Sequence, residues 1–148
     1  MMSGQTLRRF VAAALLLATH WAWSQGYLEL SAGIHRIRAE VANTTESRAE
    51  GLMYRNNLPA NYGMLFVFDQ TAQHCMWMRN TLIPLSVAFI DGNGRIINVE
   101  EMLPQTDSNH CAAKPARFAL EMSTGWFRSR GLSGGTQLNG IDKAPAPR

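Results

Sequence analysis

The stretch LSVAFIDGNGRIINVE, residues 85–100, carries the clearest structural signal in the chain. An apolar run over 85–90 is followed by the sequence DGNG at 91–94, and a second run rich in isoleucine and valine returns over 95–99. Glycine and asparagine adopt positive φ angles easily, so such residues between two apolar runs favour a tight turn. The stretch therefore predicts a β-hairpin and places the chain among β-rich folds.

Apolar runs on both sides of this hairpin predict further strands. Residues 64–68 are apolar at every position, which suits a strand covered on both faces. Residues 34–41 alternate, so that Ile37, Ala39 and Val41 face inward. The remaining candidates are 75–79, a strand that holds Phe118, Leu120 and Met122 on one face, and a short strand at 136–138.

Helical signals are few and short. Ala49, Leu52 and Met53 follow i, i+3, i+4 spacing, and Ser47 with Glu50 fits a capping box. We therefore expect a helix over about 45–55 and a second helical turn over 125–130.

These elements predict an α+β fold that is mainly antiparallel β, a compact, barrel-like single domain with one or two short helices. We expect no parallel βαβ unit, because the sequence offers no crossover helices for one. The domain is expected to span residues 25–143. Residues 144–148, Ala-Pro-Ala-Pro-Arg, are expected to form a flexible tail.

Residues 1–24 have the three parts of a cleavable secretory signal. A pair of arginines at 8–9 precedes the apolar run 10–18, and a small-x-small pattern ends at Ser24. We expect cleavage between Ser24 and Gln25; an uncleaved anchor is the alternative. The apolar run is far shorter than the ~20 residues that span a bilayer, and no second run follows. A soluble periplasmic or secreted product with no integral membrane segment is predicted.

The charge of the chain lies largely in this leader. The full sequence has 14 basic and 11 acidic side chains, a net charge of +3, and the leader holds two of the arginines. A nearly neutral mature chain does not suggest a nucleic-acid partner. A composition of 46% hydrophobic and 17% charged residues also excludes a disordered chain.

Motifs of known catalytic chemistry are absent from the sequence. It has no glycine-rich phosphate loop, HExxH, GxSxG or CxxC pattern. The leading expectation is a binding or accessory domain without cofactor or metal, whose partner is an unknown small molecule or an envelope protein. An alternative is a hydrolase of envelope material that uses Glu121 or Asp91 as its acid or base.

Two His-Cys pairs, His74-Cys75 and His110-Cys111, are the one constellation that stands out. Two cysteines in an exported domain most simply form a disulfide, here Cys75–Cys111, which would pin the polar loop 104–117. A zinc site of both pairs is disfavoured, because adjacent residues of a strand point to opposite faces.

A periplasmic Cu(I) site is a further alternative. His74, Met76 and Met78 would alternate onto one face of the strand expected at 75–79. Imidazole and thioether ligands suit Cu(I) outside the cytoplasm. The competing interpretation is that both methionines fill the core.

Several motifs together resemble a known family. They are GLMYR at 51–55, GMLFVFD at 63–69, MWMRNTLIPL at 76–85 and ALEM at 119–122. With them the chain resembles, over about residues 34–140, the bacterial and archaeal family catalogued as domain of unknown function 192. The resemblance implies a compact, largely β domain, often exported, with no established activity. Two departures are Arg79, where the family more often has lysine, and Ser86, where many members carry an aspartate.

The family pattern singles out polar and aromatic residues as candidate binding residues. They are Arg48, Trp77, Asn80, Thr81 and Glu121. A buried carboxylate needs a partner, so we expect either an Arg48–Glu121 ion pair or a cleft in which both groups hold a small polar ligand. Asn80 and Thr81 are expected to bond their own backbone in a turn, or to contact a ligand that stacks on Trp77.

Overall fold

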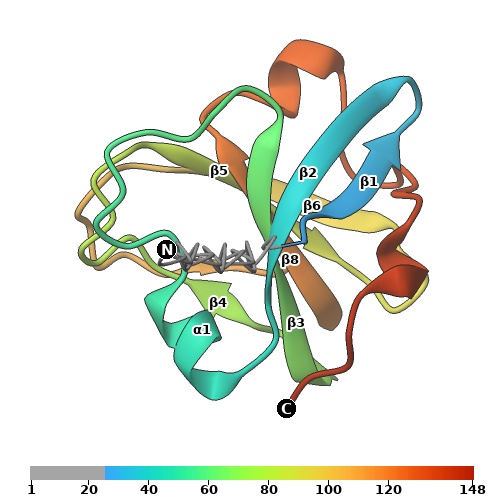
Figure 1. The fold of residues 1–148 in the computed structure, drawn as a ribbon, viewed down its shortest axis with the longest axis horizontal. Coiled ribbons are helices and arrows are strands. Elements are labelled where there is room, and N and C mark those ends of the chain that lie inside the picture. Colours follow the sequence, from blue (N-terminus) through green and yellow to red (C-terminus); the bar gives the residue numbers. More distant parts are fainter. Residues whose placement is uncertain (1–25) are drawn as a thin grey trace, which may run out of the picture.

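A computed structural model describes residues 26–148 of the chain, and the predicted leader and cleavage site lie outside these residues. Within this range the chain is mainly β, with one short α-helix (Figure 1). The elements are β1 Leu28–Ala32, β2 His35–Ala42, α1 Thr45–Glu50, β3 Tyr62–Ala72, β4 Cys75–Met76, β5 Leu85–Ile90, β6 Ile96–Met102, β7 His110–Cys111, β8 Ala116–Ser123, and the 3-10 helices η1 Arg128–Arg130 and η2 Ile141–Lys143. Among residues 26–148 no helix is long and apolar enough to cross a membrane.

Six strands form one mixed sheet in the order β1-β2-β3-β8-β5-β6, and β4 pairs with β7 in a separate two-stranded sheet. The predicted hairpin is confirmed, since β5 and β6 pair antiparallel. Its turn is held by the Asp91 carboxylate, which accepts hydrogen bonds from the backbone N–H groups of Asn93 and Arg95 at 2.9 and 3.0 Å.

Strand β3 lies inside the sheet and is covered on both faces, as its continuous apolar run predicts. Leu65 and Val67 pack on one face in a core with Leu120, and Met64 and Phe66 pack on the other. Gly63 begins this run at a point of close approach. A Cβ atom there would lie 2.3 Å from the Glu121 carbonyl oxygen, so only glycine lets β3 and β8 pair at this position.

The expectation that no parallel βαβ unit occurs is wrong. Strands β2 and β3 pair in parallel, from Arg38 opposite Tyr62 to Ala42 opposite Phe66. The connection 43–61 makes this crossover with one short helix and extended turns. A long crossover helix is therefore not required, and the short helix that the sequence predicts is sufficient.

Helix α1 is shorter than its apolar pattern predicts. It ends at Glu50, because Gly51 takes a φ of +51° and Tyr54 a φ of +63°. Its capping box is formed by Thr44 and Ser47, whose side chains each accept the other's backbone N–H at 3.1 and 3.0 Å. The capping box therefore begins at Thr44, three residues before the expected start at Ser47.

The sheet is not closed into a barrel, so the expected barrel-like shape is not found. Strands β1 and β6 remain its edges. The segment expected as a last strand makes isolated bridges to both edge regions, Gln137 with Arg95 and Asn139 with Ser31.

The end of the chain lies against Asn43. The Asn43 side-chain amide donates to the Ala146 carbonyl at 2.8 Å, and the Arg148 N–H donates to the Asn43 carbonyl at 2.7 Å. The flexibility expected of residues 144–148 remains a prediction.

Candidate functional site

Four of the five predicted binding residues line one small pocket. Arg48, Trp77, Thr81 and Glu121 come from distant parts of the sequence and meet around a cavity of about 30 Å³. Asn80 is not among the lining residues. The other walls come from α1 and the turn after it, from Phe66 of β3 and from Met76 of β4. A space of this size holds about one water molecule or a single small group.

Glu121 is the buried carboxyl group of this pocket. It lies on β8 opposite Met64 and Val87, on an otherwise apolar face, and only 4% of its surface is exposed. No residue of the range 26–148 forms an ion pair with it. Burial raises the pKa of Glu121 to about 8. At neutral pH this group is therefore mostly a neutral carboxylic acid that can donate a hydrogen bond.

The expected ion pair between Arg48 and Glu121 is wrong. The Arg48 guanidinium instead donates to the Val67 carbonyl at 3.1 Å and to the Asp69 carboxylate at 2.9 Å, both on β3. Asp69 is largely exposed, so this pair keeps one of its charges in water. A pair with Glu121 would bury both charges, which costs more desolvation than it commonly returns.

Trp77 stands at the mouth of the pocket. Its side chain is 44% exposed, and the Arg79 guanidinium lies 4.1 Å from the centre of the indole ring. Arg79 also donates to the Asp107 carboxylate at 3.0 Å, which fixes the guanidinium over the ring. The indole is thereby held in place with one face covered by a cation.

Asn80 lies in the turn that follows Trp77, and Thr81 comes directly after it; the expected side-chain bond to the local backbone is made by Thr81. Asn80 has a φ of +54°, and its carbonyl accepts the Tyr54 N–H at 2.9 Å. Thr81 is buried and donates through its hydroxyl to the Arg79 carbonyl at 3.3 Å, while its N–H donates to Met78. These bonds shape the backbone beside the pocket.

Four large apolar side chains are exposed on the connections next to the pocket. We call them together the Trp77 face: Tyr54, Trp77, Leu82 and Leu103. Backbone hydrogen bonds join the three segments that carry it: Tyr54 to Asn80, Gln105 to Thr81, and Met78 to Thr106. Figure 1 shows these connections gathered on the left of the molecule.

Sequence reasoning found only Trp77 on this face. Tyr54, Leu82 and Leu103 lie in connections rather than in periodic elements, so no spacing pattern links them. The available signal was the presence of large apolar side chains within segments that otherwise read as turns.

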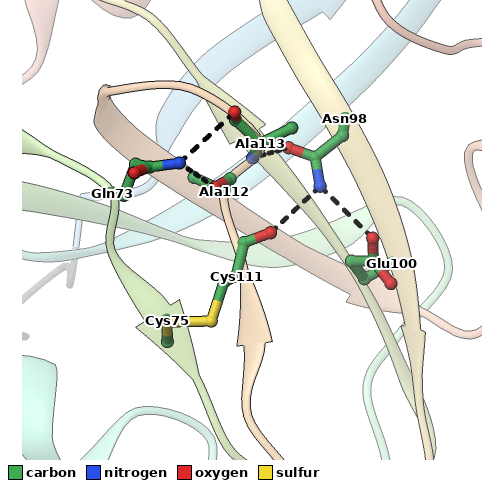
Figure 2. Close-up of a disulfide and its surroundings, with 7 residues drawn as sticks. All are labelled: Gln73, Cys75, Asn98, Glu100, Cys111, Ala112 and Ala113. Atoms are coloured by element: carbon green, nitrogen blue, oxygen red, sulfur yellow. Dashed lines mark hydrogen bonds between the residues drawn. A yellow bond between two sulfur atoms is a disulfide. The ribbon is translucent and has the colours of Figure 1, made fainter.

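The predicted disulfide is confirmed. Cys75 and Cys111 lie opposite each other in the β4–β7 pair, with sulfur atoms 2.02 Å apart. Figure 2 shows a polar framework around it: the Asn98 amide donates to the Cys111 carbonyl, and the Gln73 amide donates to the Ala112 and Ala113 carbonyls. Asn98 also accepts the Ala113 N–H at 3.0 Å. This side chain, which sequence analysis missed, ties β7 to β6.

The common face proposed for Cu(I) ligands does not form. The strand expected at 75–79 ends at Met76, so the alternation stops there. Met78 is fully buried in the core, and the His74 ring stacks on Phe68 with a centroid distance of 3.7 Å. Within residues 26–148 no group of three histidine, cysteine or acidic side chains is placed to hold a metal ion.

Comparison with known proteins finds one family and similar solved structures. A family model described as DUF192, Uncharacterized ACR, matches residues 28–140. A candidate transcription regulator from Sinorhizobium meliloti 1021 is 31% identical, with a TM-score of 0.70, over 76% of this chain and 91% of that one. A protein of unknown function from Novosphingobium aromaticivorans DSM 12444 is 29% identical, with a TM-score of 0.74, over 82% of this chain and 91% of that one. None of the curated proteins matches the chain.

Proposed function

The chain belongs to the DUF192 family, whose activity is uncharacterised, and from this premise we propose that it is a non-enzymatic accessory domain of the cell envelope that binds another envelope protein. The single observation that carries the proposal is the Trp77 face, whose Trp77 lines the Glu121 pocket. A disulfide is typical of an oxidising compartment, and the predicted leader supports a location in the periplasm or outside the cell.

The size of the pocket favours a protein partner over a small molecule. Binding sites for small molecules usually enclose about 300–1,000 Å³. The pocket at Glu121 is about 30 Å³, so it accepts one small group of a partner whose remaining contacts lie outside it. The surface around the pocket supplies those contacts.

The composition of the Trp77 face supports this role. It holds four of the six large apolar side chains that are exposed among residues 26–148. Tryptophan and arginine are the residue types most enriched among those that dominate binding energy at protein interfaces. The stacked pair Trp77–Arg79 is already ordered, so little side-chain entropy is lost on association.

Glu121 supplies specificity within this proposal. Its neutral carboxyl group donates a hydrogen bond to an acceptor such as a carbonyl oxygen of the partner. The Arg48 charge is satisfied by Asp69, so the pocket does not select an anion. A partner that places an amide or backbone carbonyl beside Trp77 fits best.

Replacing Trp77 by alanine is expected to weaken partner binding by roughly 30-fold, because a central interface tryptophan contributes about 2 kcal/mol or more. A photo-crosslinking residue placed at Leu103 traps the partner in cells that export the protein. Mass spectrometry then identifies it, and calorimetry with the purified partner measures the dissociation constant.

The matched control is the Ile34 position, which is exposed and apolar but lies in the turn between β1 and β2. A crosslinker there is expected to give no adduct, and Ile34→Ala is expected to leave affinity unchanged. Equal adducts at both positions, or an adduct at Leu103 that survives Trp77→Ala, would contradict the proposal.

A hydrolase is the second candidate, because a second carboxyl group reaches the pocket. Glu50 of α1 also lines it, so a neutral acid and an exposed carboxylate share one site. Two carboxyl groups in different environments are what acid–base hydrolysis requires. The other proposed acid, Asp91, holds the hairpin turn and does not line this pocket. Turnover of envelope glycans that disappears in Glu121→Gln would favour this candidate over the binding domain.

A further inference from the structure

A second, larger hollow shares no lining residue with the pocket at Glu121. It has a volume of about 620 Å³ and lies between the chain around Asn61 and the segment 123–130 that follows β8. We propose that this hollow is a binding site for a small organic phosphate. The proposal is independent of the Trp77 face, and it stands on the charge, the hydrogen-bond donors and the size of the hollow.

Arg128 is the anion-binding group of this site. It is exposed, lines the hollow, and has no hydrogen-bond or ion-pair partner among residues 26–148. Gly125, with a φ of +74°, turns the chain beneath it. A Cβ atom at Gly125 would lie 3.8 Å from the Arg128 Nη2 atom, so the guanidinium lies over this turn. Its five N–H donors are suited to a phosphate oxygen pair.

Arg130 adds a second positive charge that no carboxylate neutralises. Its guanidinium donates to the Trp126 carbonyl at 3.0 Å, to the Ser129 hydroxyl at 3.1 Å and to the Asn61 side-chain oxygen at 3.2 Å. It also stacks over the Trp126 ring at 4.3 Å. All of these partners are neutral, so the charge is fixed in position and remains available to an anion.

The carboxylate of Glu101 lies near the hollow and already accepts several hydrogen bonds. It accepts hydrogen bonds from the Ser86 hydroxyl at 2.6 Å, the Thr124 hydroxyl at 3.1 Å and the Gly125 N–H at 3.2 Å. Burial alone would raise the pKa of Glu101, but these bonds and the charge of Arg128 lower it. Glu101 therefore stays ionised. The two guanidinium groups outnumber this one carboxylate, so the net charge at the hollow is positive.

The remaining walls fit the organic part of such a ligand. Leu58 and Ala60 provide apolar surface, and Ser123 and Ser129 add hydroxyl groups to the lining. The volume falls in the range of small-molecule sites, about 300–1,000 Å³, unlike the pocket at Glu121. A ligand with a phosphate group and an apolar body matches this mixed lining.

The test is a ¹H–¹⁵N NMR titration of the purified protein with phenyl phosphate and, separately, with inorganic phosphate at constant ionic strength. We expect saturable shifts at the Gly125 amide and the Trp126 indole N–H, with phenyl phosphate binding more tightly. Arg128→Gln is expected to reduce the affinity at least tenfold. Lys114→Gln, which removes a charge outside the hollow, is expected to leave it unchanged.

Three results would overturn the proposal: shifts that do not saturate, an equal loss in Lys114→Gln, or equal affinities for the two probes. If Arg128→Gln unfolds at the same midpoint temperature as the wild type, a folding defect is excluded as the cause of lost binding. If Arg128→Gln unfolds early, charge-retaining Arg128→Lys serves in its place and is expected to keep part of the affinity. Trp77→Ala is expected to bind phenyl phosphate like the wild type.

Discussion

The Glu121→Gln variant is expected to be more stable than the wild type at pH 9 and of similar stability at pH 5. The pKa of Glu121 in the folded protein is about 8, against an ordinary value of 4.5. Between these two values the folded state holds a proton that the unfolded state has lost. Stability therefore falls as the pH rises through this window, and above pH 8 the penalty has reached its full size.

The size of this effect follows from the shift. One pKa unit corresponds to about 1.4 kcal/mol, so the full penalty is a few kcal/mol and at most about 5 kcal/mol. Glutamine keeps the shape of the side chain and never ionises, so it removes the penalty without opening a cavity. Urea unfolding at intervals from pH 5 to pH 9 measures the free energy of unfolding of both proteins.

The control for this experiment is Glu46→Gln, which changes an exposed carboxyl group on α1. Its free energy of unfolding is expected to follow the wild-type pH dependence. A wild-type protein whose stability is flat between pH 5 and pH 8 would show that Glu121 ionises without cost. That result would also remove the neutral donor on which the proposed specificity of the pocket depends.

The parts of the fold that the sequence predicts well are those fixed by local chemistry. The turn at 91–94 and the apolar runs beside it specify a hairpin, because side-chain alternation and turn type determine its register. The run 64–68 specifies a strand buried on both faces, since no polar residue interrupts it. The β2–β3 parallel pair was missed because its crossover uses one turn-like helix, which has no length signal of its own.

The candidate site, too, could be predicted from the sequence only in part. Family motifs picked out Arg48, Trp77, Thr81 and Glu121, and the structure brings them together. The partner of Arg48 could not be predicted, since two carboxyl groups were available and the choice of Asp69 depends on which charge can stay in water. The Trp77 face could not be predicted either, because tertiary hydrogen bonds between separate connections assemble it.

Replacing both Cys75 and Cys111 by serine is expected to lower the free energy of unfolding by roughly 3–4 kcal/mol, on the chain-entropy estimate for a loop of this length. The sequence separation is 36 residues, and the disulfide closes this loop in the unfolded chain. The wild type in dithiothreitol is expected to match the double variant, and reduction is expected to leave the double variant unchanged. Intact mass with and without reductant, differing by about 2 Da for one bond, shows that the disulfide is present.

The disulfide also matters for the Trp77 face, because strands β4 and β7 have two residues each and form few hydrogen bonds of their own. The chain between β6 and β7 carries Leu103, and the chain after β4 carries Trp77. Without the disulfide, Asn98 and Gln73 still hold the 111–113 segment, so we expect the core to remain folded while the face loosens. Loss of the disulfide should then speed hydrogen exchange more at the Met78 and Gln105 amides than in β3 and β8, where exchange rises only with the loss of global stability. An equal increase at all these positions would contradict this division, because it would make the disulfide a support of the whole sheet rather than of the Trp77 face.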